Sequence, residues 1–232
     1  MPPRKVSRKK LLKEPDEFIS TTGKVIQYVK GHQRLVMRAA LIILLIIVAG
    51  AGAFTYLRWQ EGKALSVQLE GLMIYQSAYQ ASLENPAAEK KEEYRKALDK
   101  FKESVAIYGW GKTAQMTRIF IANSHTALKE YEQAQAAYSQ SLDGPFRPVA
   151  LNGLAYLFEA QGDYPKALEY YQKNMEESTN PYRLDGLLGA ARCYEILKQT
   201  PKALEVYEKA LPQASKTALA DFIRWKIGEL KG

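Results

Sequence analysis

The chain has 232 residues, of which 47% are hydrophobic and 25% charged, and its formal net charge is +8. The length fits one or two domains, and the mixture is that of a folded protein. Residues 1–38 carry ten Lys or Arg against three acidic residues, so the remaining 194 residues are near neutral. This distribution argues against nucleic-acid binding by most of the chain. The single cysteine, Cys193, excludes an internal disulfide and leaves the redox compartment open.

Residues 1–38 form a basic head that we expect to be cytoplasmic. After Pro15, apolar residues and one threonine recur there at helical spacing: Phe18, Ile19, Thr22, Val25, Ile26 and Val29. Such a segment is typical of an amphipathic helix lying on the inner leaflet of a membrane, although Gly23 weakens it. The alternative is a solvated tail that is basic only because the cytoplasmic flank of a membrane span is usually basic.

Residues 39–58 are predicted to form a transmembrane helix. Ala39–Leu57 is a run of 19 residues without a charge, close to the roughly 20 that cross a hydrocarbon core. Ten of them are Leu, Ile, Val or Phe, and each favours insertion by about 0.3–0.6 kcal/mol. A buried core helix is one alternative, but the run has no polar face. A cleaved signal peptide is the other, but both the head and the run are longer than a signal peptide has.

The charges that flank the span predict its direction. Four basic residues come shortly before it, whereas two basic residues and one acidic residue follow it. Because positive flanks stay in the cytoplasm, the head is expected inside and the C-terminal body outside. Tyr56 and Trp59 stand where an aromatic belt would meet the outer interface. The flanking residues are Lys24, Lys30, Arg34 and Arg38 before the span, and Arg58, Glu61 and Lys63 after it.

The body, residues 59–232, contains an internal repeat. Residues 165–174 (PKALEYYQKN) and 201–210 (PKALEVYEKA) are identical at seven of ten positions, at a spacing of 36. An alanine followed four residues later by an aromatic residue recurs through the body at spacings of 37, 33 and 36. A period near 34 predicts paired helices that stack, since one helix pair cannot bury its apolar face alone. The alanines are Ala97, Ala134, Ala167 and Ala203.

This pattern resembles the tetratricopeptide repeat family. Small residues such as Ala155 and Ala167 would let paired helices approach closely, large ones such as Tyr171 would fill the space between repeats, and Gly162 would allow the turn. The resemblance implies an all-α fold, a superhelix of about four divergent helix pairs behind one transmembrane helix. Units are expected near residues 65–108, 115–144, 148–181 and 184–217, with a capping helix at 218–230.

The layout of basic head, single span and repeat body is similar to a narrower bacterial family. That family is the ancillary subunit of the SecYEG translocon, whose repeat domain is shared with the cell-division coordinator of the Tol system. The resemblance implies an inner-membrane anchor, a periplasmic body, and contact with translocon subunits, periplasmic chaperones or their clients. A repeat adaptor of another envelope machine, for cell division, outer-membrane assembly or secretion, is the alternative.

Catalytic chemistry finds little support in the sequence. There are two histidines, His32 and His125, and no HExxH, GxGxxG, GxSxG or phosphate-loop motif occurs. Cys193 and His125 are the one conceivable nucleophile–base pair, but they fall on first helices two repeats apart. A buried structural thiol explains Cys193 better. The protein is therefore expected not to be an enzyme and to need neither cofactor nor metal, while its oligomeric state stays open.

Protein binding is the better interpretation of the body. In tetratricopeptide repeats the first helix of each unit lines a concave face, and the resemblance places seven residues on it. Asn123 and Arg192 are candidates to hold a peptide backbone or carboxylate. Ile119 stands where chaperone-binding relatives carry the leading Lys of a carboxylate clamp, so that clamp is not predicted. The seven groove residues are Ile119, Phe120, Asn123, Asn152, Tyr156, Leu188 and Arg192.

Overall fold

The computed structural model describes residues 17–85, 90–176, 180–214 and 218–232, with side chains described from residue 23 onward. Within these residues every regular element is a helix, which confirms the all-α prediction. The chain divides into two compact units, residues 1–58 and residues 59–232. The long helix α3 (Gln33–Glu84) begins in the first unit and ends in the second, so the predicted span and the first helix of the body are one unbroken helix.

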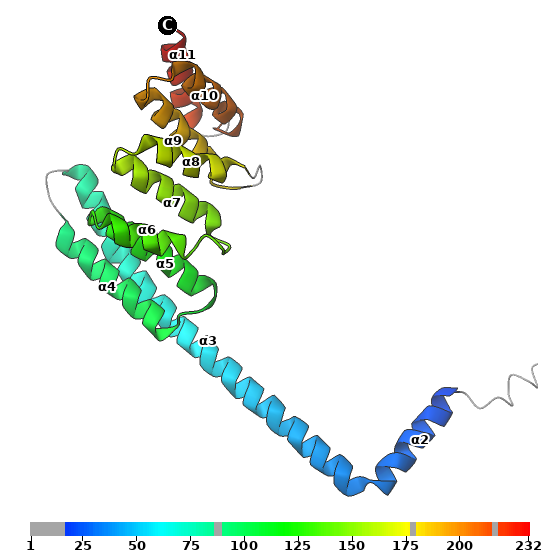
Figure 1. Cartoon of the computed structure of the whole chain (residues 1–232). Helices are drawn as coiled ribbons and strands as arrows, with labels where there is room; N and C mark the ends of the chain where they lie inside the picture. Colours follow the sequence, from blue (N-terminus) through cyan, green and yellow to red (C-terminus); the bar gives the residue numbers. More distant parts are fainter. Residues whose placement is uncertain (1–16, 86–89, 177–179, 215–217) are drawn as a thin grey trace, which may run out of the picture. The chain divides into compact units, whose positions relative to one another are not determined.

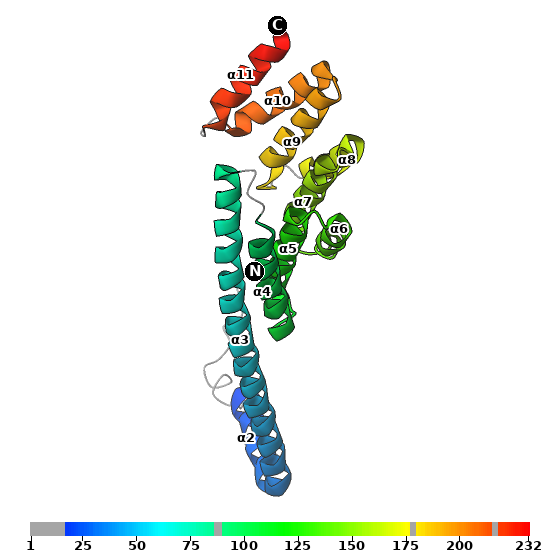
Figure 2. The same ribbon diagram turned by 90° about the vertical axis from the view of Figure 1, so that its left-hand side faces the viewer.

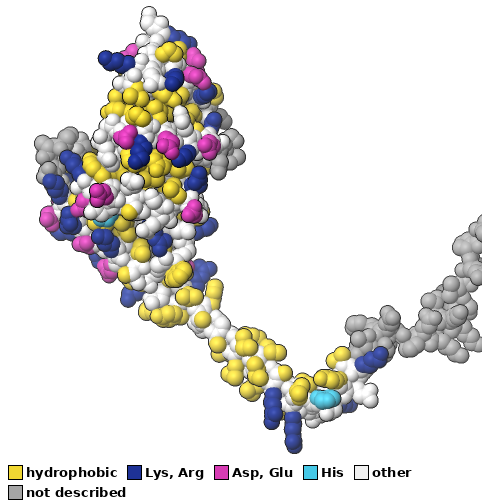
Figure 3. Space-filling model, viewed as in Figure 1, with side chains coloured by type: hydrophobic (Ala, Val, Ile, Leu, Met, Phe, Trp, Pro, Cys, Tyr) yellow, Lys and Arg dark blue, Asp and Glu magenta, His cyan; other side chains and the backbone are white. Residues whose placement is uncertain are grey.

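The first unit contains α2 (Glu17–Gly31) and the N-terminal part of α3. Every side chain from Leu41 to Val48 is more than half exposed, as the apolar surface of this unit in Figure 3 shows. By length and composition α3 qualifies as a membrane span, a test that a signal sequence near an N-terminus also passes. The predicted amphipathic segment falls on α2, but Phe18, Ile19 and Thr22 lie outside the described side chains, and residues 1–16 lie outside the description.

The second unit begins with the C-terminal part of α3, followed by three helices (Figures 1 and 2). These are α4 (Lys91–Ile107), α5 (Gly111–Ala127) and α6 (Tyr131–Ser139). Both α4 and α5 pack on α3. The Ser104 hydroxyl donates to the Ala64 carbonyl at 2.8 Å, and the Thr117 hydroxyl donates to Gln68 Oε1 at 3.0 Å. Residues 86–89, between α3 and α4, lie outside the description.

Five further helices complete the stack in chain order (Figure 1). Arg147–Ala160 (α7) pairs with Tyr164–Met175 (α8), and Arg183–Ile196 (α9) pairs with Thr200–Ala214 (α10). The last helix, α11 (Leu219–Lys231), packs on α10. The predicted units at 148–181 and 184–217 fall on these two pairs, and the predicted cap falls on α11.

A repeated contact between aromatic and glycine residues holds the stack together. The alanines that recur in the sequence are fully buried, and so are the aromatic residues four positions later: Phe101, Tyr138, Tyr171 and Tyr207. Three of these rings press against a glycine of a neighbouring helix. A Cβ atom at Gly153 would lie 2.3 Å from Tyr138, one at Gly189 would lie 2.2 Å from Tyr171, and one at Gly71 would lie 2.9 Å from Phe101. Only glycine leaves room for these rings at native packing density.

The turns inside the repeats share one geometry. Lys129, Gly162 and Lys198 have φ of 61°, 80° and 56°, the left-handed region. In each turn the next residue donates its N–H to the carbonyl five positions back, as Asp163 does to Phe158 at 2.9 Å, the bond of a Schellman motif. Glycine adopts this conformation freely at Gly162, whereas the two lysines bear a cost of about 1 kcal/mol each.

Candidate functional site: a tyrosine-lined groove

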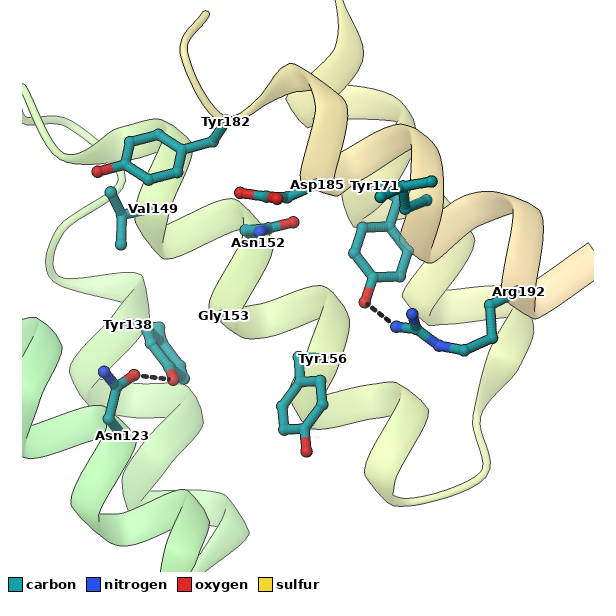
Figure 4. A pocket seen from close by; sticks show the side chains of 11 residues that line it. Asn123, Tyr138, Val149, Asn152, Gly153, Tyr156, Tyr171, Tyr182, Asp185 and Arg192 are labelled. Atoms are coloured by element: carbon teal, nitrogen blue, oxygen red, sulfur yellow. Dashed lines mark hydrogen bonds between the residues drawn. The ribbon is translucent and has the colours of Figure 1, made fainter. Parts of the chain in front are cut away.

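A cavity of the repeat unit lies along α7, between its neighbours α5 and α9 (Figure 4). It has a volume of about 460 Å³. Four tyrosines supply much of its wall, and asparagine, aspartate and arginine side chains supply polar groups. Such a wall of aromatic faces with a few placed polar groups suits an extended polypeptide. Its lining comprises Asn123, Tyr138, Val149, Asn152, Gly153, Tyr156, Tyr171, Tyr182, Asp185, Leu188 and Arg192.

A second cavity of about 390 Å³ adjoins the first, because Asn123, Tyr138 and Tyr156 line both. Four more tyrosines line it, from α3, α4 and α6, together with Lys129. We call the two cavities together the tyrosine groove. Its added tyrosines are Tyr75, Tyr79, Tyr94 and Tyr131.

Tyrosine hydroxyls in the groove are fixed by acceptors on the first helix of their own repeat. The Tyr138 hydroxyl donates to Asn123 Oδ1 at 2.6 Å, and the Tyr171 hydroxyl donates to Glu159 Oε2 at 2.8 Å. Burial raises the pKa of Tyr138 to about 12, and burial followed by the charge of Glu159 raises the pKa of Tyr171 further. Both phenols therefore stay protonated at physiological pH and keep their donor roles.

Arg192 is neutralised inside the structure. Its Nε lies 2.5 Å from Glu159 Oε1 and its Nη2 lies 2.7 Å from Glu159 Oε2, a two-pronged ion pair between α9 and α7. This hydrogen-bonded pairing raises the pKa of Arg192 above its usual range. Its guanidinium therefore already has a carboxylate partner, and the expectation that Arg192 holds a peptide carboxylate stays a prediction.

Asn123 and Asp185 offer the groove's available polar groups. Asn123 uses its carbonyl oxygen for Tyr138, and among the described residues its amide nitrogen makes no hydrogen bond. The Asp185 carboxylate pairs with no cation in the described part of the chain, and burial raises its pKa. The amide nitrogen is a donor for a peptide carbonyl, and the carboxylate is an acceptor for a peptide N–H or a basic side chain.

Five of the seven predicted groove residues line the first cavity: Asn123, Asn152, Tyr156, Leu188 and Arg192. The other two lie elsewhere. Ile119 is 2% exposed in the core, because it shares the inward face of α5 with the fully buried Ala122. Phe120 stacks on Phe101 of α4 with ring centroids 5.2 Å apart.

Sequence reasoning missed Glu159, which joins Tyr171 and Arg192 in one polar cluster. The signal was present, because Glu159 precedes Arg192 by 33 residues, about one repeat period. It also missed Asp185 and the buried tyrosines Tyr138 and Tyr171 as groove residues, since these read as packing positions in a repeat.

Cys193 lies on α9 and His125 on α5, and each has its own structural surroundings. Cys193 is fully buried on α9, and burial raises the pKa of its thiol to about 12, the opposite of what a thiolate nucleophile needs. His125 on α5 is engaged through Nδ1 with Glu130 at 2.6 Å. No cluster of three or more His, Cys, Asp or Glu side chains suited to a metal occurs in the described parts of the chain.

The match to a known family covers the later repeats. The profile described as tetratricopeptide repeat matches residues 146–216, the stretch that holds α7–α10. Residues 146–216 are thus similar to tetratricopeptide repeats. This fold is typically a scaffold for protein–protein interaction rather than a catalyst.

A solved structure extends the likeness of fold over most of the chain. A structure described as a functional characterization of Pseudomonas aeruginosa pilF is 14% identical, with a TM-score of 0.58 over 74% of this chain and 68% of that one. A putative kinesin light chain from Podosopora anserina with tetratricopeptide-like repeats is 18% identical, with a TM-score of 0.49 over 75% and 84% of the two chains. BtubC (BKLC) from P. vanneervenii is 16% identical, with a TM-score of 0.49 over 75% and 82%.

At 14% identity, the structure with the TM-score of 0.58 shows a likeness of fold alone. No curated protein matches the sequence.

Proposed function

We propose that this protein is a membrane-anchored scaffold of the bacterial envelope that binds extended segments of partner proteins in the tyrosine groove. The observation that carries the proposal is the groove itself, a row of tyrosine faces with the Asn123 amide and the Asp185 carboxylate unpaired among the described residues. Aromatic faces bind apolar and polar side chains alike, and the two polar groups match the alternating N–H and C=O of an extended backbone.

The anchor in this proposal is the N-terminal part of α3. Eight consecutive apolar side chains from Leu41 to Val48 are exposed there, and each gains about 1.5–3 kcal/mol on transfer from water to an apolar environment. A bilayer supplies that environment to a helix whose backbone groups are already paired. The basic head favours a cytoplasmic N-terminus, which leaves the repeats in the periplasm.

The partner class in this proposal is the secretion translocon with its periplasmic chaperones or clients. Support for it comes from the layout of basic head, single span and divergent repeats. An adaptor of another envelope machine has the same layout, so the identity of the captured partner separates the two.

Photocrosslinking from inside the groove tests the proposal. A photoreactive phenylalanine analogue replaces Tyr156, which is 56% exposed in the groove, and in a matched variant it replaces Gln133, which is exposed on α6 and lines neither cavity. Capture of translocon subunits or periplasmic chaperones at Tyr156, but not at Gln133, is expected. Capture of another envelope machine supports the alternative, and equal capture at both positions contradicts groove binding.

Topology is tested separately. Protease added to spheroplasts is expected to degrade residues beyond 60 and to spare the head. Protection of the repeats in intact spheroplasts, with digestion after lysis, would refute the periplasmic assignment.

A further inference from the structure

An apolar stripe runs along the side of α3 that the repeats leave uncovered. Its members follow one another at spacings of 4, 3, 4, 3 and 4 residues, the a and d positions of a heptad. All except the half-buried Leu72 are exposed, with Leu65 at 43%, Leu69 at 48% and Leu83 at 58%. We call this stripe the α3 seam: Leu65, Leu69, Leu72, Gln76, Tyr79 and Leu83.

A neighbouring face of α3 is used by the protein's own packing. Five residues there are buried against α4 and α5, and the contacts of Gly71 with Phe101 and of Gln68 with Thr117 show which helices cover them. The seam lies about 100° round the helix from that face, since Leu65 directly follows the buried Ala64. Its residue Tyr79 also lines the second cavity of the tyrosine groove, so the seam borders the groove there. The buried residues are Ala64, Val67, Gln68, Gly71 and Ala78.

The exposed side of α3 is also nearly free of charge. Between Lys63 and Glu84 the only charged residue is Glu70, which lies about 140° round the helix from Leu65 at 100° per residue. A row of exposed leucines without flanking charges is unfavourable in water. It suits a second helix of the same kind, because a symmetric pair then brings no like charges together.

We infer that a second copy of this chain covers the α3 seam, in a parallel, in-register two-stranded coiled coil. The inference rests on the proposed anchor for its direction, since two chains that leave the membrane through equivalent spans run parallel. In that arrangement each seam residue meets its own counterpart. Gln76, at an a position among leucines, would meet the other Gln76 and form an amide pair, the kind of polar contact that fixes register and strand number.

The length of the seam explains why the membrane matters. Leu65–Leu83 spans about 28 Å at 1.5 Å per residue, fewer than three heptads, and isolated helices of that length associate weakly in water. Here α4 and α5 already hold the helix formed, so pairing does not have to order it. Confinement to one membrane adds an effective concentration of about millimolar.

Cysteine crosslinking in native membranes tests the inference. The parent chain is a suitable background, because its one thiol, Cys193, is fully buried with a raised pKa. Leu65→Cys and Leu72→Cys place thiols on the seam, whereas Glu70→Cys and Ser77→Cys place thiols on α3 away from it. With an oxidant, we expect seam variants to form disulfide-linked homodimers at least about tenfold more than the controls, because same-residue disulfides need Cβ atoms about 4 Å apart.

Three outcomes would overturn the inference. The first is equal crosslinking at seam and control positions, which indicates random collision. The second is the absence of homodimer while a maleimide labels the seam thiols. The third is a disulfide between a seam cysteine and a different protein, which assigns the seam to that protein.

A charge substitution supplies a second, independent test on the full chain in detergent or nanodiscs. Gln76→Glu puts two carboxylates face to face in the seam and is expected to raise the dimer dissociation constant at least about tenfold. Ser77→Glu adds the same charge one residue away, off the seam, and is expected to leave dimerisation unchanged. Unchanged circular dichroism shows that both variants fold, and an equal effect of the two would contradict a seam contact.

The anchor and the dimer fail in different ways. Carbonate extraction reports whether the chain is integral to the membrane, and it reads the same for monomer and dimer. Release into the soluble fraction defeats the proposed anchor, whereas retention in the membrane without seam crosslinks defeats the dimer alone.

Discussion

The early repeats (α3–α6) and the late repeats (α7–α10) use the same apolar packing but different polar contacts. Phe101 rests on Gly71 in the early part as Tyr171 rests on Gly189 in the late part. In the late part the Tyr171 hydroxyl donates to Glu159 and the Tyr207 hydroxyl donates to Glu195. Each glutamate also binds a cation, Arg192 of α9 and Lys226 of α11 respectively. The early part has Asn123 in place of this glutamate.

The substitution opens the groove. Asn123, Glu159 and Glu195 are spaced 36 residues apart, and Tyr156 precedes Arg192 by the same interval. Where the Glu159–Arg192 ion pair joins α7 to α9, the corresponding positions on α5 and α7 hold the Asn123 amide and the exposed Tyr156. Buried aromatic rings packed on glycines therefore hold the stack in both regions. The residue at the position of Asn123, Glu159 and Glu195 decides where a ligand finds unpaired polar groups.

The largest effect on stability is expected when a buried aromatic ring that packs on a glycine is removed. Tyr171→Ala and Phe101→Ala should each lower the free energy of unfolding by about 3–5 kcal/mol, because each leaves a large cavity in a buried contact. Tyr156→Ala, at an exposed position, should change it by less than about 0.5 kcal/mol. Denaturant titration of the three variants measures this, and a mild Phe101→Ala would break the equivalence of the two regions.

The next largest effect is expected when a glycine that faces a buried ring is replaced by alanine. Gly189→Ala puts a Cβ 2.2 Å from the Tyr171 ring and should cost about 1–3 kcal/mol by overpacking. Gly71→Ala should cost less, because its Cβ would lie 2.9 Å from Phe101. Gly228→Ala on α11 meets no atom within 4 Å and should stabilise by up to about 1 kcal/mol through helix propensity. Thermal unfolding measures these changes in stability. The opposite signs expected for Gly189→Ala and Gly228→Ala provide the control.

The Glu159–Arg192 ion pair should contribute less to stability than the buried aromatic rings do. Arg192 is about half exposed, so its pairing with Glu159 is expected to contribute about 1 kcal/mol. A double-mutant cycle with Glu159→Gln and Arg192→Met isolates that coupling. The corresponding cycle with Asn123→Ala and Tyr156→Ala should give a coupling near zero. Similar couplings in both cycles would show that the two regions do not differ in the way described.

The smallest effect is a pH dependence in the early region. The hydrogen bond from His125 lowers the pKa of Glu130 below its ordinary 4.5, with Arg95 acting in the same direction. A depressed carboxyl pKa stabilises the fold above about pH 4.5, and the stabilisation is lost as pH falls through the folded value. Melting temperatures between pH 6 and 3 should fall more steeply for the parent than for Glu130→Gln. Glu132→Gln, an exposed change on α6, should keep the parent's slope.

The repeats were predictable because their signal is local and periodic. The recurring pair of an alanine and an aromatic residue four positions later predicted buried positions. The structure buries four of them: Ala167, Tyr171, Ala203 and Tyr207. The groove was predictable in part, since the repeat register gave the correct face for Asn152, Tyr156 and Leu188. On α5 the same register gave the correct face for Asn123, whereas Ile119 one turn earlier is buried in the core and Phe120 stacks on Phe101.

The sequence by itself determined the all-α repeat, the residues that pack within it and the charge-free run in α3, because each is written as a period or a composition. Only the tertiary structure decided the state of the groove. Whether Arg192 is free or neutralised depends on where Glu159, a repeat away, directs its carboxylate, and that follows from how neighbouring helices are staggered. The packing of α4 and α5 on one face of α3 likewise leaves the leucines of the neighbouring α3 seam exposed or half-buried.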